Sequence, residues 1–222
     1  METAALGAVE RLQQAGLEVV SAASASPGVA VLGERGDPPL RSIVLAAPLD
    51  TEARGARLAE ESSGVAAVLA AARELAGDPG RAGVRVALLS GERASPPWQG
   101  SLGAGSVAKS AALVVYVNRA CGLPERRDLL SHRVLRERFF RAAGAAPEPG
   151  MFEQADGPQA ELALAGARRV LVLNAPARTE SCDPEPLAEA LVRFARDADR
   201  LLAGDHPHRP EEPDPPAAGG GP

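Results

Sequence analysis

Four short, strongly apolar runs constrain the fold of this chain more than any other sequence feature. Runs of this length suit strands that are buried on both faces of a parallel sheet, and patterns typical of helices separate them. The sequence therefore predicts an α/β fold, a three-layer sandwich in which helices cover a mixed, mostly parallel central sheet. The four runs are residues 43–47, 84–89, 113–117 and 170–173.

Apolar residues that recur three or four positions apart predict the helices between these strands. Serine can cap a helix, and Ser62 and Ser63 are therefore expected at the start of the second helix. Asp183 as N-cap and Pro184 in the first turn mark the start of the last helix, and Gly144 marks the end of the third. The expected helices cover residues 3–15, 62–77, 129–143 and 184–203, and residues 17–23 and 29–33 are predicted as further short strands.

The chain has 222 residues, which suits one domain, and its apolar fraction of 45% is sufficient for an ordinary core. Aromatic residues make up only 3%, so this core must consist mainly of Ala, Val and Leu. The composition changes after residue 204, where six Pro, three Gly and several acidic residues follow without an apolar period. We expect one domain over residues 1–204 and a disordered tail over residues 205–222.

Charge and hydropathy argue against several classes of partner. The net charge is −5, the acidic residues are dispersed and aromatic residues are scarce, so no nucleic-acid partner is expected. Only Lys109 among the 24 basic residues is Lys, and this excess of Arg, together with that of Ala, Gly and Pro, is typical of a GC-rich genome. No stretch approaches the roughly 18 to 20 apolar residues of a membrane span, and the N-terminus lacks a signal-peptide pattern. We therefore expect a cytoplasmic protein in which Cys121 and Cys182 are free, buried thiols.

Three motifs follow the predicted strands in a fixed order. The first strand ends in Pro48-Leu-Asp, the helix after it contains Glu60-Glu-Ser-Ser-Gly, and the next strand leads into Ser-Gly-Glu92-Arg93. This order resembles the co-catalytic zinc aminopeptidase family, which also includes the glutaminyl cyclases and the non-catalytic ectodomains of nicastrin, nicalin and transferrin receptor. The resemblance covers about residues 3–203. It implies a sheet of about eight strands, with a cleft at the carboxyl ends of the central strands.

Most of the zinc-ligand positions that the resemblance implies hold residues that cannot bind zinc. The family's first His falls on Pro48 and its third carboxylate on Ala120, and neither side chain has a donor atom. Arg93 replaces a ligating Glu, and a permanent cation repels a metal ion. Asn174 replaces the last His. Only Glu60, in the place of the bridging Asp, still offers a carboxylate, and one carboxylate cannot hold the metal pair that the family's chemistry needs.

Two arginines, Arg93 and Arg178, resemble internal replacements for the positive charge of the lost metal ions. Asp50, which orients the first His in the family, and Glu92, in the place of the general base, are both present. Either Arg93 or Arg178 is expected to pair with one of the carboxylates, because an unpaired buried carboxylate is costly. Alternatively, these side chains face solvent and pair with nothing. The predicted binding cleft consists of Asp50, Glu60, Glu92, Arg93, Asn174 and Arg178.

Other constellations carry weaker signals. Residues 103–110 resemble a phosphate-binding loop, but no strand precedes the first glycine, so nucleotide binding is not expected. The three histidines, His132, His206 and His208, have no metal-binding spacing. Cys121 lies beside the lost third carboxylate and is the one thiol that could face the cleft, although a buried, inert thiol is the stronger expectation.

The sequence thus predicts a non-catalytic pseudo-peptidase domain without a cofactor or metal, acting as a binding or structural module for an unknown protein or peptide partner. The principal alternative is a working metal-dependent hydrolase in which Glu92 acts with a different metal or none. A third possibility is a subunit of a larger assembly. Fold-level analogy alone cannot decide among the three.

Overall fold

The computed structural model describes ten segments of the chain, and every structural statement below refers to them. They comprise residues 2–22, 31–35, 42–49, 56–77, 84–89, 111–124, 129–131, 133–144, 169–175 and 181–204. Of the predicted cleft residues, Glu60 and Asn174 fall within these segments. Asp50, Glu92, Arg93 and Arg178 lie outside them, as do the phosphate-loop-like residues 103–110 and the predicted tail over residues 205–222.

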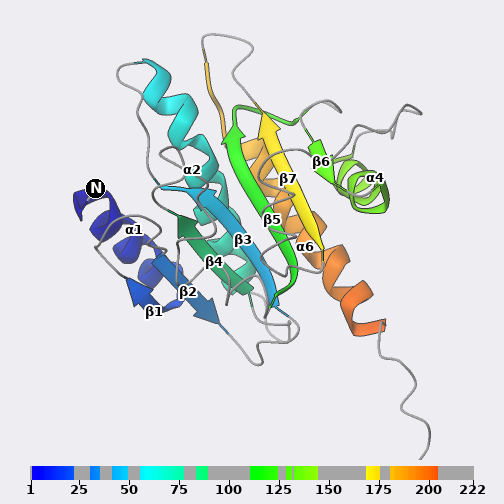
Figure 1. The fold of residues 1–222 in the computed structure, drawn as a ribbon, viewed down its shortest axis with the longest axis horizontal. Coiled ribbons are helices and arrows are strands. Elements are labelled where there is room, and N and C mark those ends of the chain that lie inside the picture. Colours follow the sequence, from blue (N-terminus) through cyan, green and yellow to red (C-terminus); the bar gives the residue numbers. More distant parts are fainter. Residues whose placement is uncertain are drawn as a thin grey trace, which may run out of the picture.

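Seven strands form one mixed sheet in the order β1-β2-β4-β3-β5-β7-β6 (Figure 1). The four central strands β4, β3, β5 and β7 are parallel to one another, whereas β1, β2 and β6 pair antiparallel at the two sides. The predicted α/β fold class with its parallel central sheet is therefore confirmed. The strands are β1 (Glu18–Ala22), β2 (Val31–Arg35), β3 (Ser42–Pro48), β4 (Val84–Leu89), β5 (Ala111–Ala120), β6 (Leu129–Ser131) and β7 (Val170–Ala175).

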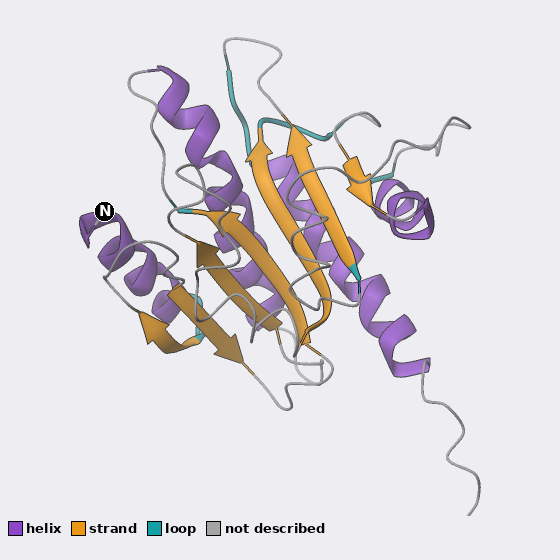
Figure 2. Cartoon of the chain, in the orientation of Figure 1, coloured by secondary structure: helices purple, strands orange, loops and turns teal. Residues whose placement is uncertain are grey.

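Helices α1, α2 and α6 pack side by side against one face of the sheet (Figure 2). The fourth described helix, α4, lies at the β6 side and packs against α6, where Phe139 and Phe194 meet edge to face with ring centroids 5.7 Å apart. Among the described residues, α1, α2 and α6 form one helical layer, and the second helical layer of the expected sandwich stays a prediction. The helices are α1 (Glu2–Gln14), α2 (Ala56–Ala76), α4 (Arg133–Ala142) and α6 (Glu185–Gly204).

The core between this helical layer and the sheet is almost entirely aliphatic. Alternate residues of the parallel strands, such as Leu45, Val115 and Leu173, are buried against Ala and Leu side chains of the helices. The strand residues between them are buried as well, and Tyr116 on β5 is only 1% exposed. Burial on both faces explains why these strands could be recognised as unbroken apolar runs.

Helix α2 begins earlier than the sequence pattern indicated. Ser62 and Ser63 were expected as its caps, but the helix starts at Ala56 and both serines lie inside it. Their hydroxyls donate back to the carbonyl oxygens of Ala59 and Glu60, three residues earlier. The segment that precedes the serines is rich in Ala, Leu and Glu, which are strong helix formers, and this preference extends the helix.

The expected helix over residues 129–143 is also corrected. Leu129 and Leu130 belong to β6, which pairs antiparallel with β7, and α4 starts only at Arg133. The free edge of β7 offers unpaired backbone groups, and pairing with them outweighs the local helical pattern. The predicted stop is confirmed, because Gly144 follows the helix with a φ of 76°, a conformation that favours glycine.

Candidate functional site

Helix α2 touches the backbone of β5 at one point, close to the carboxyl end of the strand. A Cβ atom built on Gly64 would lie 2.5 Å from the carbonyl oxygen of Val117 and 2.7 Å from that of Asn118. Only glycine allows this approach. At the same point the register between β5 and β7 shifts between Val117 and Arg119, so β5 carries a bulge there. The contact holds the first turns of α2 against the strand end where the family cleft is expected.

Ser63 links the same two elements through its side chain. Its hydroxyl accepts a hydrogen bond of 2.7 Å from the backbone N–H of Ala120 and donates one of 2.5 Å to the carbonyl oxygen of Glu60. The residue is only 2% exposed. Both capacities of the hydroxyl are therefore used, and the N–H of the last residue of β5 is satisfied by α2 rather than by a neighbouring strand.

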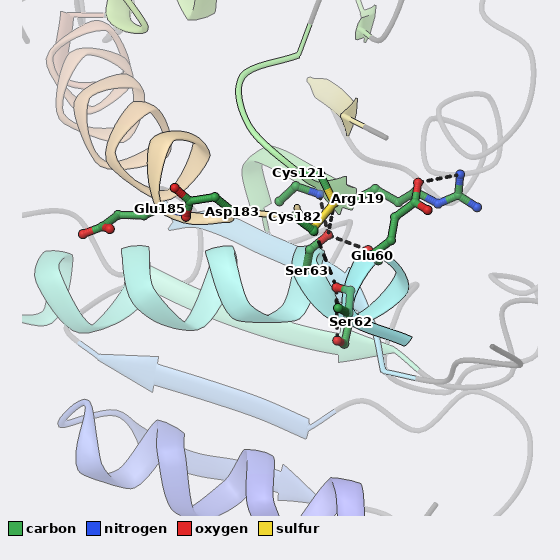
Figure 3. Close-up of a disulfide and its surroundings, with 10 residues drawn as sticks. Glu60, Ser62, Ser63, Arg119, Cys121, Cys182, Asp183 and Glu185 are labelled. Atoms are coloured by element: carbon green, nitrogen blue, oxygen red, sulfur yellow. Dashed lines mark hydrogen bonds and ion pairs between the residues drawn. A yellow bond between two sulfur atoms is a disulfide. The ribbon is translucent and has the colours of Figure 1, made fainter. Parts of the chain in front are cut away.

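An ion pair lies beside this contact. Arg119 Nη1 on β5 is 3.6 Å from Glu60 Oε1 on α2, and the two side chains are 32% and 23% exposed (Figure 3). Arg119 Nε is buried and has no hydrogen-bond partner among the described residues. The geometry holds a permanent cation next to the one carboxylate that survives among the family's ligand positions, and it leaves a spare N–H donor on that cation.

Two asparagines join the carboxyl ends of β5 and β7. Asn118 Nδ2 donates a hydrogen bond of 3.3 Å to Asn174 Oδ1, and both residues are half-buried. Asn174 lies directly opposite Arg119 in the strand register. Residues opposite each other in a sheet share a face, so the two asparagines and Arg119 form one polar group next to Glu60.

Cys121 and Cys182 form a disulfide, which corrects the expectation of two free thiols. Cys121 follows the last residue of β5, and Cys182 precedes α6. Because parallel strands end at the same edge of a sheet, the segments that follow β5 and β7 come together there although 61 positions separate the two cysteines. A loop of that length predicts about 4 kcal/mol of stabilisation in the chain-entropy treatment.

Backbone hydrogen bonds hold the segments on both sides of this disulfide. Cys121 N–H donates to the carbonyl oxygen of Ala175 at 2.9 Å, and Gly122 N–H donates to that of Asp183 at 2.8 Å. Asp183 also caps α6, since its Oδ1 accepts from the N–H of Glu185 at 3.0 Å, and the predicted N-cap is thereby confirmed. The end of β5 and the start of α6 are thus tied together, and we call this region, residues 120–122 with 182–185, the joint.

The described ligand positions do not fit a zinc ion. Pro48 and Ala120 are the buried last residues of β3 and β5 and carry no donor atom. The Asn174 amide oxygen accepts from Asn118, and the Glu60 carboxylate faces a guanidinium. Within the described segments no three His, Cys, Asp or Glu residues are grouped closely enough to hold a metal ion.

No described helix is long and apolar enough to cross a membrane.

Arg119 is the residue that sequence reasoning missed. The expected partners of the carboxylates were Arg93 and Arg178, both outside the described segments, whereas the described partner of Glu60 is Arg119. One signal was available, because a permanent cation stands directly before Ala120, the position that has lost its carboxylate. Strict alternation along the strand gives a second signal, because Val115 and Val117 face the helices and Arg119 is the next residue on that face.

Solved structures with a similar fold include aminopeptidases and a glutaminyl cyclase. Legionella pneumophila LapA aminopeptidase superposes with a TM-score of 0.64 at 13% sequence identity, over 89% of this chain and 65% of LapA. A leucine aminopeptidase precursor from Bacteroides thetaiotaomicron gives 0.60 at 14% identity, over 86% and 85% of the two chains. Porphyromonas gingivalis glutaminyl cyclase gives 0.57 at 12% identity, over 88% of each.

Sequence comparison adds no closer relation. No family model matches the chain, and no curated protein does. The chain spans slightly less than two thirds of the length of LapA. At identities this low the likeness shows an aminopeptidase-like and cyclase-like fold and transfers no activity.

Proposed function

We propose that this chain is a non-catalytic, peptidase-related domain that acts as a binding or structural module. The observation that supports the proposal most directly is the pair between Arg119 and Glu60 at the carboxyl end of β5. A co-catalytic zinc pair generates hydroxide and stabilises an oxyanion, and both tasks need several carboxylate and imidazole ligands. A guanidinium beside the only retained ligand carboxylate supplies a fixed positive charge instead, with donors that match carboxylate geometry.

The binding surface that we propose extends the cleft predicted from sequence. It comprises Asp50, Glu60, Glu92, Arg93, Asn174 and Arg178, and Arg119 and Asn118 are added to it. The partly exposed guanidinium of Arg119 has N–H donors that suit an oxygen acceptor such as a peptide carbonyl. An extended protein or peptide segment is therefore the partner class that we favour, and the module needs no cofactor to bind it.

Two other functions remain candidates. The solved structures that share the fold include aminopeptidases and glutaminyl cyclases, and this favours the alternative of a hydrolase with a remodelled site around Glu92. The third candidate is a subunit that stabilises a larger assembly. A cytoplasmic location stays a prediction, and the Cys121–Cys182 disulfide weighs against it, because such bonds persist mainly in oxidising compartments.

Metal content and hydrolysis, measured together on the full chain, test the proposal. We expect no stoichiometric zinc after incubation with zinc and desalting, and no turnover of aminoacyl or N-terminal glutaminyl peptides. Pro48→His alone should restore neither, because the other ligands stay absent. One or two tightly held zinc ions per chain, or peptide hydrolysis that Glu92→Gln abolishes, would overturn the non-catalytic assignment and favour the hydrolase.

A further inference from the structure

The Cys121–Cys182 disulfide lies where three elements of the proposed binding surface meet. It connects the end of β5 to the start of α6, and Figure 3 shows it next to the first turns of α2. Cys121 Sγ is 3.8 Å from Ser63 Oγ, and Cys182 Sγ is 3.8 Å from the carbonyl oxygen of Ala59. The bond therefore contacts the helix that carries Glu60, and Cys121, just beyond the end of β5, is only two residues after Arg119.

The disulfide lies outside the buried core, among partly exposed residues. Both cysteines are half-buried, in contrast to the fully buried aliphatic core. Their neighbours Leu123, Ser181 and Asp183 are exposed. We therefore expect a thiolate to reach the bond without opening the core, and access of this kind distinguishes exchangeable disulfides from inert ones.

The contacts that remain after the bond is broken are few and local. Three backbone N–H groups, those of Ala120, Cys121 and Gly122, still bind Ser63, Ala175 and Asp183. The core cluster consists mainly of aliphatic residues of the strands and of α1, α2 and α6, together with Phe139 and Phe194, and it includes neither cysteine. Loss of the disulfide should consequently loosen the joint between β5 and α6 while the sheet stays folded.

We propose that the Cys121–Cys182 disulfide is a reversible redox modification site that controls how firmly the end of β5, with Arg119, is held against Glu60. In the oxidised chain the joint is closed and the ion pair is kept in place. In the reduced chain the segment from Arg119 to Gly122 gains freedom, and the guanidinium becomes available to a ligand. The proposal concerns regulation of the cleft and so rests on the proposed function in naming that cleft as the binding surface.

The chemistry requires a dithiol reductant, either a small molecule or a dithiol redox protein. Its thiolate attacks one sulfur of the protein disulfide, the bond between Cys121 and Cys182 breaks, and the released thiolate takes up a proton. The second thiol of the reductant then attacks the mixed disulfide and releases the other cysteine. The protein gains two electrons and two protons, and the dithiol becomes a disulfide.

The test uses the full chain and amide hydrogen exchange, with residue-level fragmentation in the mass spectrometer. The chain has only two cysteines, so reduced dithiothreitol can act on no other disulfide within it. We expect exchange at Ala120, Cys121 and Gly122 to become roughly tenfold faster or more on reduction and to return on reoxidation. At the core strands, for example at Val86 and Val115, exchange should remain much slower than at the joint in both states, because these amides exchange only when the whole domain unfolds.

A double variant, Cys121→Ser with Cys182→Ser, is the matched control. It should exchange like the reduced wild-type chain, and dithiothreitol should not alter it. Because the wild-type chain is itself measured in both states, the result does not depend on the folding of the variant. In a titration with mixtures of reduced and oxidised dithiothreitol, mass or alkylation gives the ratio at which half of the Cys121–Cys182 disulfide is reduced.

Three results would overturn the proposal. Exchange at the joint could be the same in both states, the whole domain could unfold on reduction, or the bond could resist reduction until denaturant is added. All are measured without ligand or substrate, so they stay distinct from the metal and hydrolysis assays. A chain that binds zinc and still loosens reversibly would disprove the proposed function and keep the redox site.

Discussion

The hydroxyl of Ser63 on α2 accepts the backbone N–H of Ala120 at the end of β5, 2.7 Å away, and is itself 2% exposed. Ser63→Ala leaves that buried N–H without a partner, so the free energy of unfolding should fall by about 1 to 3 kcal/mol. The exposed neighbour Ser62 provides the control, and Ser62→Ala should change stability by less than about 0.5 kcal/mol. Urea unfolding measures both, and equal effects would show that the Ala120 contact is unimportant.

The close approach at Gly64 predicts a result opposite to helix propensity. Gly64→Ala should destabilise the domain by roughly 1 to 3 kcal/mol, because the added methyl group would meet two backbone carbonyl oxygens at 2.5 and 2.7 Å. Gly7→Ala in α1 has no atom within 4 Å of its new methyl group and should stabilise the domain by about 0.5 to 1 kcal/mol. Thermal unfolding of the two variants should therefore show shifts of opposite sign.

The pair between Arg119 and Glu60 should contribute modestly to stability, because both side chains are partly exposed. A double-mutant cycle with Arg119→Met and Glu60→Gln should give a coupling of about 1 kcal/mol or less, reduced by salt. The control is the more exposed pair between Arg193 and Glu189 on α6, where the same cycle should give about 0.3 to 0.5 kcal/mol. A coupling of several kcal/mol between Arg119 and Glu60 would contradict this expectation and would mean that the pair is shielded from water.

Loss of the disulfide should have a larger effect than loss of the ion pair. Cys121→Ser with Cys182→Ser should lower the free energy of unfolding by about 2 to 4 kcal/mol, since the bond closes a long loop in the unfolded chain. The melting temperatures of the double variant and of the reduced wild-type chain should agree. If the double variant were as stable as the oxidised chain, closing the loop between residues 121 and 182 would not lower the entropy of the unfolded chain as expected.

Local chemistry made part of this structure predictable. The run at residues 84–89 coincides with β4 because both faces of that strand are buried, so no polar side chain interrupts it beyond Arg85. Asp183 could be recognised as a cap because a capping carboxylate contacts an N–H only two residues away. Features of this kind are contained in a short window of sequence.

The features that escaped prediction depend on residues far apart in the chain. Leu129 and Leu130 have a helical pattern, and only the free edge of β7, some 40 residues later, makes them a strand. The partner of Cys121 lies 61 positions away, and the partner of Arg119 lies on α2. The charge-replacement idea named Arg93 and Arg178, which lie outside the described residues, and it stays a prediction, whereas the described partner of Glu60 is Arg119, which follows a strand bulge.

The burial of Tyr116 gives the molecule an intrinsic spectroscopic reporter. It is the only tyrosine of the chain, it is 1% exposed, and it stands in the central strand β5, three residues before Arg119. Its ultraviolet absorption therefore senses whether the sheet is intact. Second-derivative absorbance should stay constant while the joint at Cys121 opens and should change only when the whole sheet melts. Measured beside hydrogen exchange at the joint, this optical signal separates local opening of the site from loss of the fold.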